Sequence, residues 1–344
     1  MVEKFGFTAG EASIALALDG YYVWDCAVIG AEGKYHMFSS RWPEKRGFGS
    51  NWLFNSEIIH SVADSPEGPF RFVNTVLPRR GRQYFDGMNT HNTCIREYRG
   101  KFYLYYMGTT YGGEIPEKAS DIPWRYSEET WNRKRIGIAI ANSINGDFER
   151  RDKPLLEPRD CSFWDCTVTT NPAVAILPGG KTYMIYKSRR AVGEPLMLGV
   201  AVADKPDGVF ERLCDGPILQ FSDKDIHVED PYLWYDSDRK KFCLIAKDDS
   251  KNGHFGITGE WGSGFYAESE DCVHFEIAKN PKVYSRTVQW KGGGKSTQCN
   301  LERPYILFDE NGAPAYLYCA SGQGERPYDF NQKTYIMCFK LNKQ

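Results

Sequence analysis

Short apolar and aromatic runs, each bounded by a polar turn, recur along the whole chain. Five of these runs follow a turn built from Gly, Asn, Lys or Arg, as strands of hairpins do. They are KYHMFSS (34–40), KFYLYYMG (101–108), KTYMIYKS (181–188), KFCLIAKD (241–248) and PAYLYCAS (314–321). An earlier apolar strand precedes each of them, so the pattern predicts five hairpins.

A second element alternates with these hairpins and lengthens the repeat. It is a strand, a Ser/Asp–Gly turn and an aromatic residue, as in VADSPEGPF (62–70), IANSINGDF (140–148) and VADKPDGVF (202–210). The five hairpins open at residues spaced 67, 79, 59 and 73 apart, namely Asp25, Asn92, Asn171, Asp230 and Arg303. Four-stranded units repeated five times, with little helix signal, predict an all-β fold: one five-bladed β-propeller forming a single domain over residues 1–344. A β-sandwich with as many strands does not account for this long period.

Composition narrows the classes of partner. Lys and Arg number 43 against 45 Asp and Glu, and this balance argues against a nucleic-acid partner. No apolar run reaches 18 residues, so we expect no membrane span. The first residues lack a basic region and a cleavage site, which favours a cytoplasmic location, or a periplasmic or secreted one if a signal peptide has been removed. The ten cysteines show no paired spacing and are interpreted as reduced thiols, with disulfides left open for an exported protein.

The residues that open the five hairpins are polar. In a propeller the innermost strand of each blade borders the central channel, so these openings should converge on one pocket. Turn chemistry accounts for part of this polarity. It does not account for the acids and histidines that accompany the turns. Several carboxylates beside His and Arg are instead typical of a site of acid–base chemistry. The opening residues considered as site candidates are Trp24, Asp25, His91, Asn92, Asn171, His227, Glu229, Asp230, Glu302 and Arg303.

Taken in order, the blade motifs resemble those of five-bladed glycoside hydrolases of families 43 and 117. The resemblance covers essentially the whole chain, through WDCAVIGAEGKYHMF, HNTCIREYRGKFYLYYMG, TTNPAVAILPGGKTYMIYK, HVEDPYLWYD and LERPYILFDENGAPAYLY. It implies an inverting glycosidase in which one carboxylate is the base, one is the acid and a third tunes them. We expect exo-action on the terminal sugar of a small oligosaccharide.

The resemblance also implies a role for particular residues. Asp25 stands where the family places the general base, and Glu229 stands where family 43 places the acid. The tuning aspartate is replaced by Asn171. The triplet WDC at 24–26, which contains Asp25, occurs a second time at 164–166, and Asp165 of this second WDC is the predicted substitute. His227 is the rival acid, because residues i and i+2 of a strand share a face and a histidine titrates near neutral pH. A turn-capping role for Asp165 stays open.

The remaining candidates concern binding. We expect the substrate to contact residues at the channel end, namely Trp24, His91, Asn92, Trp164, Asn171, Glu302 and Arg303. Arg303 could hold a substrate carboxylate or pair with a catalytic acid. The insertion at 108–135 is typical of a functional rim loop. No cofactor is required; the resemblance to family 43 leaves room for a calcium ion in the channel, and the sequence indicates no metal ligands.

Two other functions compete with hydrolysis. A carbohydrate-binding propeller without activity would explain Asn171. A glycoside phosphorylase would need a basic cluster to hold phosphate, for which Arg303 and His91 are candidates. Hydrolysis is favoured because Asp25, Asp165 and Glu229 supply the carboxylates.

For an inverting enzyme the acid and base carboxyls should lie about 6.5–9.5 Å apart, against about 5–5.5 Å in a retaining one. Neither the sugar nor the oligomeric state is indicated.

Overall fold

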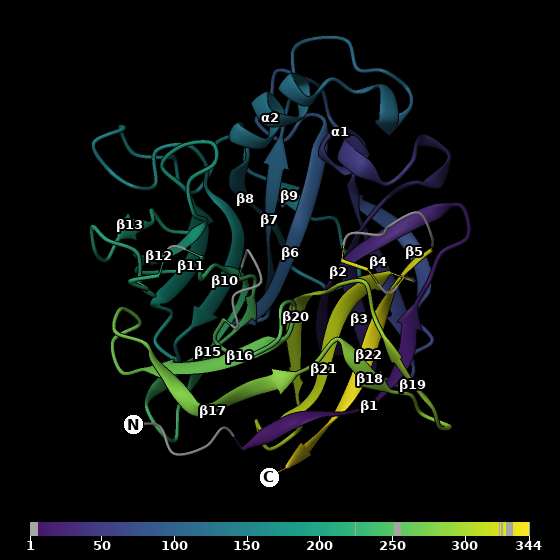
Figure 1. Cartoon of the computed structure of the whole chain (residues 1–344), viewed down its shortest axis with the longest axis vertical. Coiled ribbons are helices and arrows are strands. Elements are labelled where there is room, and N and C mark those ends of the chain that lie inside the picture. Colours follow the sequence, from purple (N-terminus) through teal and green to yellow (C-terminus); the bar gives the residue numbers. More distant parts are fainter. Residues whose placement is uncertain are drawn as a thin grey trace.

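The computed structural model describes residues 6–223, 225–250, 256–322, 324, 326–327 and 333–343. Five four-stranded antiparallel sheets contain most of its strands (Figure 1). This arrangement confirms the predicted five-bladed β-propeller. The outermost parts of the predicted single domain, residues 1–5 and 344, lie outside the described residues.

The blades follow one another along the chain, each with its innermost strand first. Blade I contains β2 (Tyr21–Ala31), β3 (Lys34–Pro43), β4 (Glu57–Ala63) and β5 (Arg71–Leu77). Blade II contains β6 (Asn89–Tyr98), β7 (Lys101–Thr109), β8 (Arg135–Ala141) and β9 (Glu149–Arg150). Blade III contains β10 (Thr170–Ile176), β11 (Thr182–Ser188), β12 (Met197–Ala203) and β13 (Glu211–Arg212). Blade IV contains β14 (Val228–Asp236), β15 (Lys241–Asp248), β16 (Gly264–Ser269) and β17 (Glu276–Tyr284).

Blade V joins the two ends of the described chain. It contains β20 (Leu301–Phe308), β21 (Pro314–Gly322) and β22 (Thr334–Lys343), with β1 (Phe7–Leu16) as its outermost strand. β1 pairs antiparallel with β22, from Phe7 opposite Lys343 to Leu16 opposite Ile336. The ring of blades is therefore closed by backbone hydrogen bonds between β1 and β22, which lie together in the lower part of Figure 1.

Few elements lie outside the blades. A small hairpin, β18 (Thr287–Gln289) and β19 (Lys295–Thr297), connects blades IV and V and contains the GGGK stretch. The helical segments are η1 (Glu44–Arg46), η2 (Gly49–Asn51), α1 (Trp52–Asn55), η3 (Ala119–Asp121) and α2 (Trp124–Asn132). In Figure 1, α1 and α2 lie together at one end of the molecule, beyond β6 and β7. No helix in the described part of the chain has the length and apolar composition to cross a membrane.

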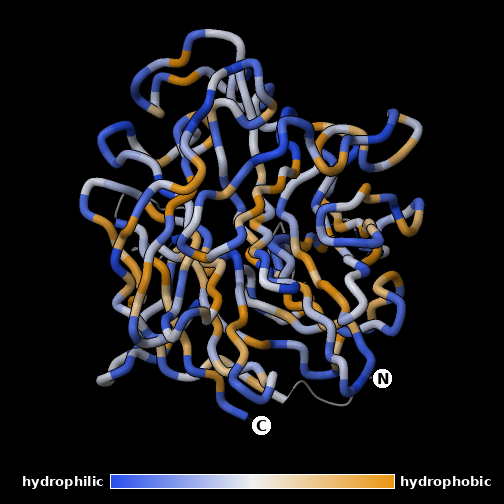
Figure 2. Tube along the Cα trace, turned by 180° about the vertical axis from the view of Figure 1, so that it is seen from behind, coloured by the Kyte–Doolittle hydropathy of each residue, from blue (hydrophilic) through white to orange (hydrophobic). Residues whose placement is uncertain are grey.

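The apolar residues run along the strands and the hydrophilic ones lie in the connections (Figure 2). The inner and second strands are buried on both faces, as in β7, where Phe102 to Thr109 are all buried. Such strands read as continuous apolar runs rather than alternating ones. This is why the five recurrent runs were visible in the sequence.

The same backbone irregularity opens every blade. The innermost strand of each has a bulge in its pairing, and the residue at each bulge has a positive φ of 51–60°. Asn and Asp adopt this left-handed conformation more readily than other non-glycine residues. The five residues are the predicted blade openings, Asp25, Asn92, Asn171, Asp230 and Arg303. The repeated bulge therefore directs five polar side chains to one level of the channel.

Below this level the channel is filled. The guanidinium of Arg96, on β6, donates to the carbonyls of Val174 at 2.7 Å and Leu233 at 3.0 Å, and to the hydroxyl of Tyr305. These partners lie on the inner strands of blades III, IV and V. Arg96 therefore crosslinks the ring and blocks the channel beneath the polar residues.

Candidate active site

The five bulge residues form a hydrogen-bonded belt across the channel. Arg303 donates from Nε to Asp25 Oδ1 at 2.9 Å and contacts Asp230 Oδ1 at 3.4 Å. Asn171 donates from Nδ2 to Asp230 Oδ1 at 2.6 Å, and the backbone N–H of Asn92 donates to Asp25 Oδ2 at 2.8 Å. Two carboxylates thus share one guanidinium, and two amides occupy the remaining positions of the belt.

A pocket of about 300 Å³ lies on this belt, at the end of the channel where the inner strands begin. Its volume is at the lower limit for ligand sites, which suits one sugar ring better than a long chain. Aromatic side chains form its walls and charged groups its floor. The lining residues are Trp24, Trp42, Phe48, Trp52, His91, Asn92, Trp131, Lys134, Asn171, Lys187, Leu196, Glu229, Asp230, Glu302 and Arg303.

Asp25 is completely buried directly beneath the pocket and does not line it. Burial alone would raise its pKa, but the charges of His91 and Arg303 and the hydrogen bonds from Ser40 and Asn92 outweigh burial, so the pKa of Asp25 is lowered. Burial lowers the pKa of His91 to about 4, so the imidazole is neutral at neutral pH. Arg303 is therefore the charge that keeps Asp25 ionised there.

Two glutamates face the pocket from equivalent positions, each one residue before the bulge of its blade. Lys187 donates to Glu229 Oε1 at 2.9 Å, and Lys247 lies 2.6 Å from Glu302 Oε1 and 3.7 Å from Glu229 Oε2. The pKa of Glu302 is raised, first by burial and then by the negative charges of Asp230 and Glu229, against the opposing effect of Lys247. The pocket thus holds a pair of carboxyl groups bridged by one lysine, a setting that suits proton transfer.

The structure does not bring Asp165 to the pocket, and the expectation that it would do so is corrected. Asp165 is completely buried between Arg159 at 2.7 Å, Arg212 at 2.9 Å and the hydroxyl of Tyr186 at 2.7 Å. Blade II contains the same cluster around Asp86, with Arg80, Arg150 and Tyr106. The second WDC therefore corresponds to FDG (85–87) and not to the first WDC. Both aspartates hold the entry loop of a blade against its outer strands.

Replacing Asp165 by Asn is expected to lower the free energy of unfolding by about 3 kcal/mol, because two partly buried guanidinium groups lose a fully buried carboxylate; Arg159 keeps its contact with Asp215. Turnover per folded molecule should stay within about twofold of the wild type. Asp86→Asn is the matched control, because it breaks the equivalent cluster in blade II. Urea unfolding and active-site titration measure the two quantities. A loss of turnover in Asp165→Asn that Asp86→Asn does not share would return Asp165 to the active site.

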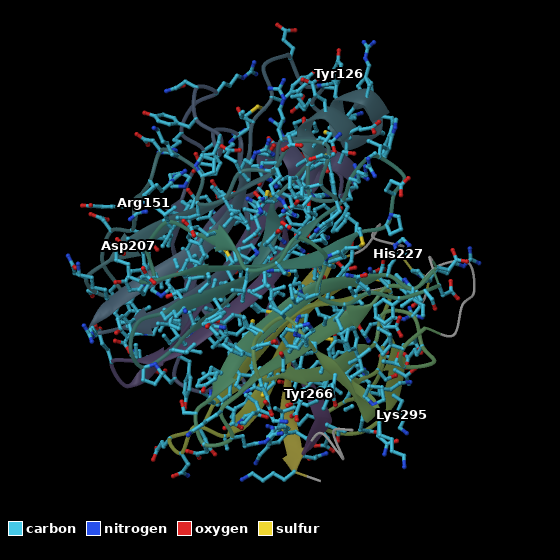
Figure 3. The ribbon with its side chains drawn as sticks, turned by 90° about the vertical axis from the view of Figure 1, so that its left-hand side faces the viewer. Tyr126, Arg151, Asp207, His227, Tyr266 and Lys295 are labelled. Atoms are coloured by element: carbon cyan, nitrogen blue, oxygen red, sulfur yellow. The ribbon has the colours of Figure 1, made fainter. Side chains whose placement is uncertain are left out.

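Two further candidates lie away from the pocket. Trp164 stacks on Tyr186 with ring centroids 6.1 Å apart and packs beside Asp165, so it is a packing residue and not a sugar platform. His227 precedes β14 and does not line the pocket. In Figure 3 it lies near the edge of the molecule. The structure therefore offers no support for His227 as the acid.

The other candidates line the pocket as expected from their place in the blades, namely Trp24, His91, Asn92, Asn171, Glu229, Glu302 and Arg303. Sequence reasoning missed the lysines. Lys187 and Lys247 each stand next to last in an otherwise apolar strand, in KTYMIYKS and KFCLIAKD. The signal that the sequence offered for these lysines was a charged residue near the end of an otherwise apolar strand. Trp131 and Lys134 come from the insertion at 108–135. The sequence predicted a functional rim loop there but did not indicate which of its residues would line the pocket.

A larger hollow of about 1,080 Å³ lies at the opposite end of the channel, beyond Arg96. Its charged groups are paired with each other: Glu268 accepts from Lys241 at 2.8 Å and also contacts Arg239. Surface hollows at the wide end of a propeller need no ligand to explain them. The smaller pocket is the better candidate because its titratable groups converge. Among the described residues, no cluster of three or more His, Cys, Asp or Glu side chains is arranged to hold a metal ion.

The fold and the site together thus define a class of protein, a five-bladed propeller with a small polar pocket at one end of its channel. Comparison with solved structures places the chain beside glycoside hydrolases of that class. Zg3597, a family 117 glycoside hydrolase of Zobellia galactanivorans, superposes with a TM-score of 0.66 at 15% identity, over 97% of this chain and 90% of its own. An endo-arabinase from Bacteroides thetaiotaomicron superposes with a TM-score of 0.59 at 11% identity, over 96% and 98%. The resemblance to these propellers is confirmed at the level of the fold.

Sequence comparison gives a weaker likeness in the same direction. The extracellular endo-α-(1→5)-L-arabinanase 2 of Bacillus subtilis (strain 168) is 23% identical over 270 residues, covering 74% of this chain and 48% of that protein. The chain therefore spans about half the length of this curated relative. No protein-family model matches the chain.

Proposed function

We propose that this protein is a glycoside hydrolase that removes a terminal sugar from an oligosaccharide. The observation that carries the proposal is the convergence of Glu229, Glu302 and the underlying Asp25 on one small pocket with aromatic walls. Paired carboxyls and aromatic platforms are what hydrolysis of a glycosidic bond requires. The size of the pocket supports exo-action, and the likeness to propeller hydrolases supports the chemistry.

For the acid we propose Glu229. It lines the pocket and stands in blade IV, where the family resemblance places this role. Its neighbour Glu302, whose pKa is raised, is the competing donor. The negative charge of Glu229 is one cause of that raised pKa, and both carboxyl groups contact Lys247.

For the base we propose Asp25. Three of its hydrogen bonds are 2.5–2.9 Å long, from Ser40, Asn92 N–H and Arg303. The fourth, from Asn92 Nδ2 to Oδ1, is 3.4 Å and is the weakest. Asn92 lines the pocket, so a small rotation of its amide would open Oδ1 to a water molecule there. Inversion follows if that water attacks from the side opposite the acid.

The test is a panel of aryl glycosides, α-(1→5)-arabino-oligosaccharides and acidic oligosaccharides, assayed with and without phosphate. We expect release of single sugar units, with the first-formed anomer inverted as followed by NMR. The double variant Glu229→Gln with Glu302→Gln is the inactive control. Saturable binding without turnover would make the protein a carbohydrate-binding propeller. Formation of a sugar 1-phosphate that requires phosphate would make it a phosphorylase.

A further inference from the structure

One basic side chain of the pocket has no acid beside it. Lys134 is 2% exposed and lines the pocket, and no acidic oxygen of the described residues lies within 4 Å of its ammonium. The other basic groups are matched: Lys187 with Glu229, Lys247 with Glu302, and Arg303 with Asp25 and Asp230. Leaving an ammonium buried without a counter-charge is unfavourable, so the site is built for a group that the chain does not supply.

The surroundings of Lys134 fix its position. Its Nζ lies 3.5 Å from the ring centroid of Trp131 and 5.5 Å from that of Trp52, both of which line the pocket. Its backbone is anchored on both sides, since its N–H donates to the carbonyl of Trp131 and its carbonyl accepts from Thr169. The ammonium is therefore held against the aromatic wall, where the flat face of a sugar would pack.

A second cation contacts Trp131. The guanidinium carbon of Arg189 is 3.9 Å from the same ring centroid, and its buried Nε has no hydrogen-bond partner in the described structure. Burial, and then the positive charge of Lys187, hold the pKa of Lys134 well below its usual range. The charges of Glu229 and Asp230 act in the opposite direction on the pKa of Lys134 but do not offset these two effects. Lys134, Lys187 and Arg189 thus place three cations around the Trp131 side of the pocket.

We infer that the sugar bound in this pocket carries a carboxylate, which Lys134 holds against the Trp131 wall. A carboxylate supplies the single negative charge that the unmatched ammonium lacks. Inorganic phosphate carries more charge than one lysine balances, so phosphorolysis is the less suited use of the same cation. The inference rests on the proposed function and narrows it to acidic sugars of the uronic-acid type.

The experiment measures binding by calorimetry at matched ionic strength. The probes are sodium glucuronate and galacturonate, glucose and galactose, and inorganic phosphate. We expect the uronates to bind at least about tenfold more tightly than the matching neutral sugars, as a charge-assisted hydrogen bond provides. Lys134→Met should remove this preference, measured as the ratio of uronate affinity to the affinity for the matching neutral sugar. Its methylene chain still packs on Trp131, and Lys279→Met, at an exposed lysine of β17, is the matched control.

The outcomes separate this inference from the proposed function. The inference is overturned if uronates and neutral sugars bind with equal affinity. It is also overturned if Lys134→Met loses affinity for phosphate and not for the uronates. Uronate binding that depends on Lys134 in a protein that hydrolyses no glycoside supports the inference and overturns the hydrolase. Should Lys134→Met fail to fold, judged by its circular dichroism, Lys134→Gln replaces it, with the same loss of uronate preference expected.

Discussion

Replacing Glu229 by Gln is expected to slow hydrolysis of a glycoside with a poor leaving group by about 10²–10⁴-fold, the range that general acid catalysis contributes. The amide keeps the size of the side chain but has no proton to give to the departing oxygen. The loss should be much smaller for a 2,4-dinitrophenyl glycoside, because that phenolate leaves without a proton. The ratio of kcat/KM for the two leaving groups measures the effect.

Glu302→Gln is the matched control for this prediction. It neutralises the partner carboxyl, which also contacts Lys247, from the equivalent position of blade V. If Glu229 is the donor, Glu302→Gln should affect both leaving groups to the same extent. If the strong dependence on leaving group is found in Glu302→Gln and not in Glu229→Gln, the acid belongs to blade V and our assignment is wrong.

Asp25→Asn is expected to damage both stability and turnover. The carboxylate balances the buried guanidinium of Arg303, and removing one partner of a buried pair costs about 3–5 kcal/mol. If Asp25 is also the base, turnover of the folded fraction should fall by at least ~100-fold. Urea unfolding at neutral pH measures the first effect, and initial rates under conditions where the variant is folded measure the second.

The difference in stability between the wild type and Asp25→Asn changes with pH in a defined direction. Because the pKa of Asp25 is lower in the folded protein than its ordinary value of 3.8, its contribution to stability is complete above that value. The contribution disappears as the pH falls through the lower, folded pKa. The gap in stability between wild type and Asp25→Asn should therefore narrow only in strongly acidic solution. Ser40→Ala, which removes one hydrogen bond to the ionised Asp25 and leaves the ion pair with Arg303 in place, should cost only about 1.5–3 kcal/mol. Equal costs for the two variants would contradict the ion-pair account.

The fold was accessible from the sequence because blade strands are buried on both faces and repeat five times. The same repeat identified the five bulge residues, although the reason was partly misjudged. Asn and Asp occupy these positions in part because the backbone there has a positive φ. Polar residues at blade openings therefore indicate backbone geometry as well as chemistry.

The errors in the site have particular causes. Asp165 was matched to Asp25 through three identical letters, whereas its structural counterpart is Asp86, whose neighbours differ. Lys134 lies in an insertion that belongs to no repeat, so no comparison between blades could reveal that it lines the pocket.

The pairing of β1 with β22 has a consequence for the order in which the molecule assembles. Phe7 and Lys343 are 336 residues apart (343 − 7), so the last sheet forms only after the strands of the four other blades have been made. Four sheets use neighbouring segments and need no distant partner, whereas the fifth requires closing a loop that contains all the others. Until then β22 presents an open edge to which a strand from another copy could add. Because Arg303 and Glu302 lie on the fifth sheet, the pocket becomes complete at this same late step of folding.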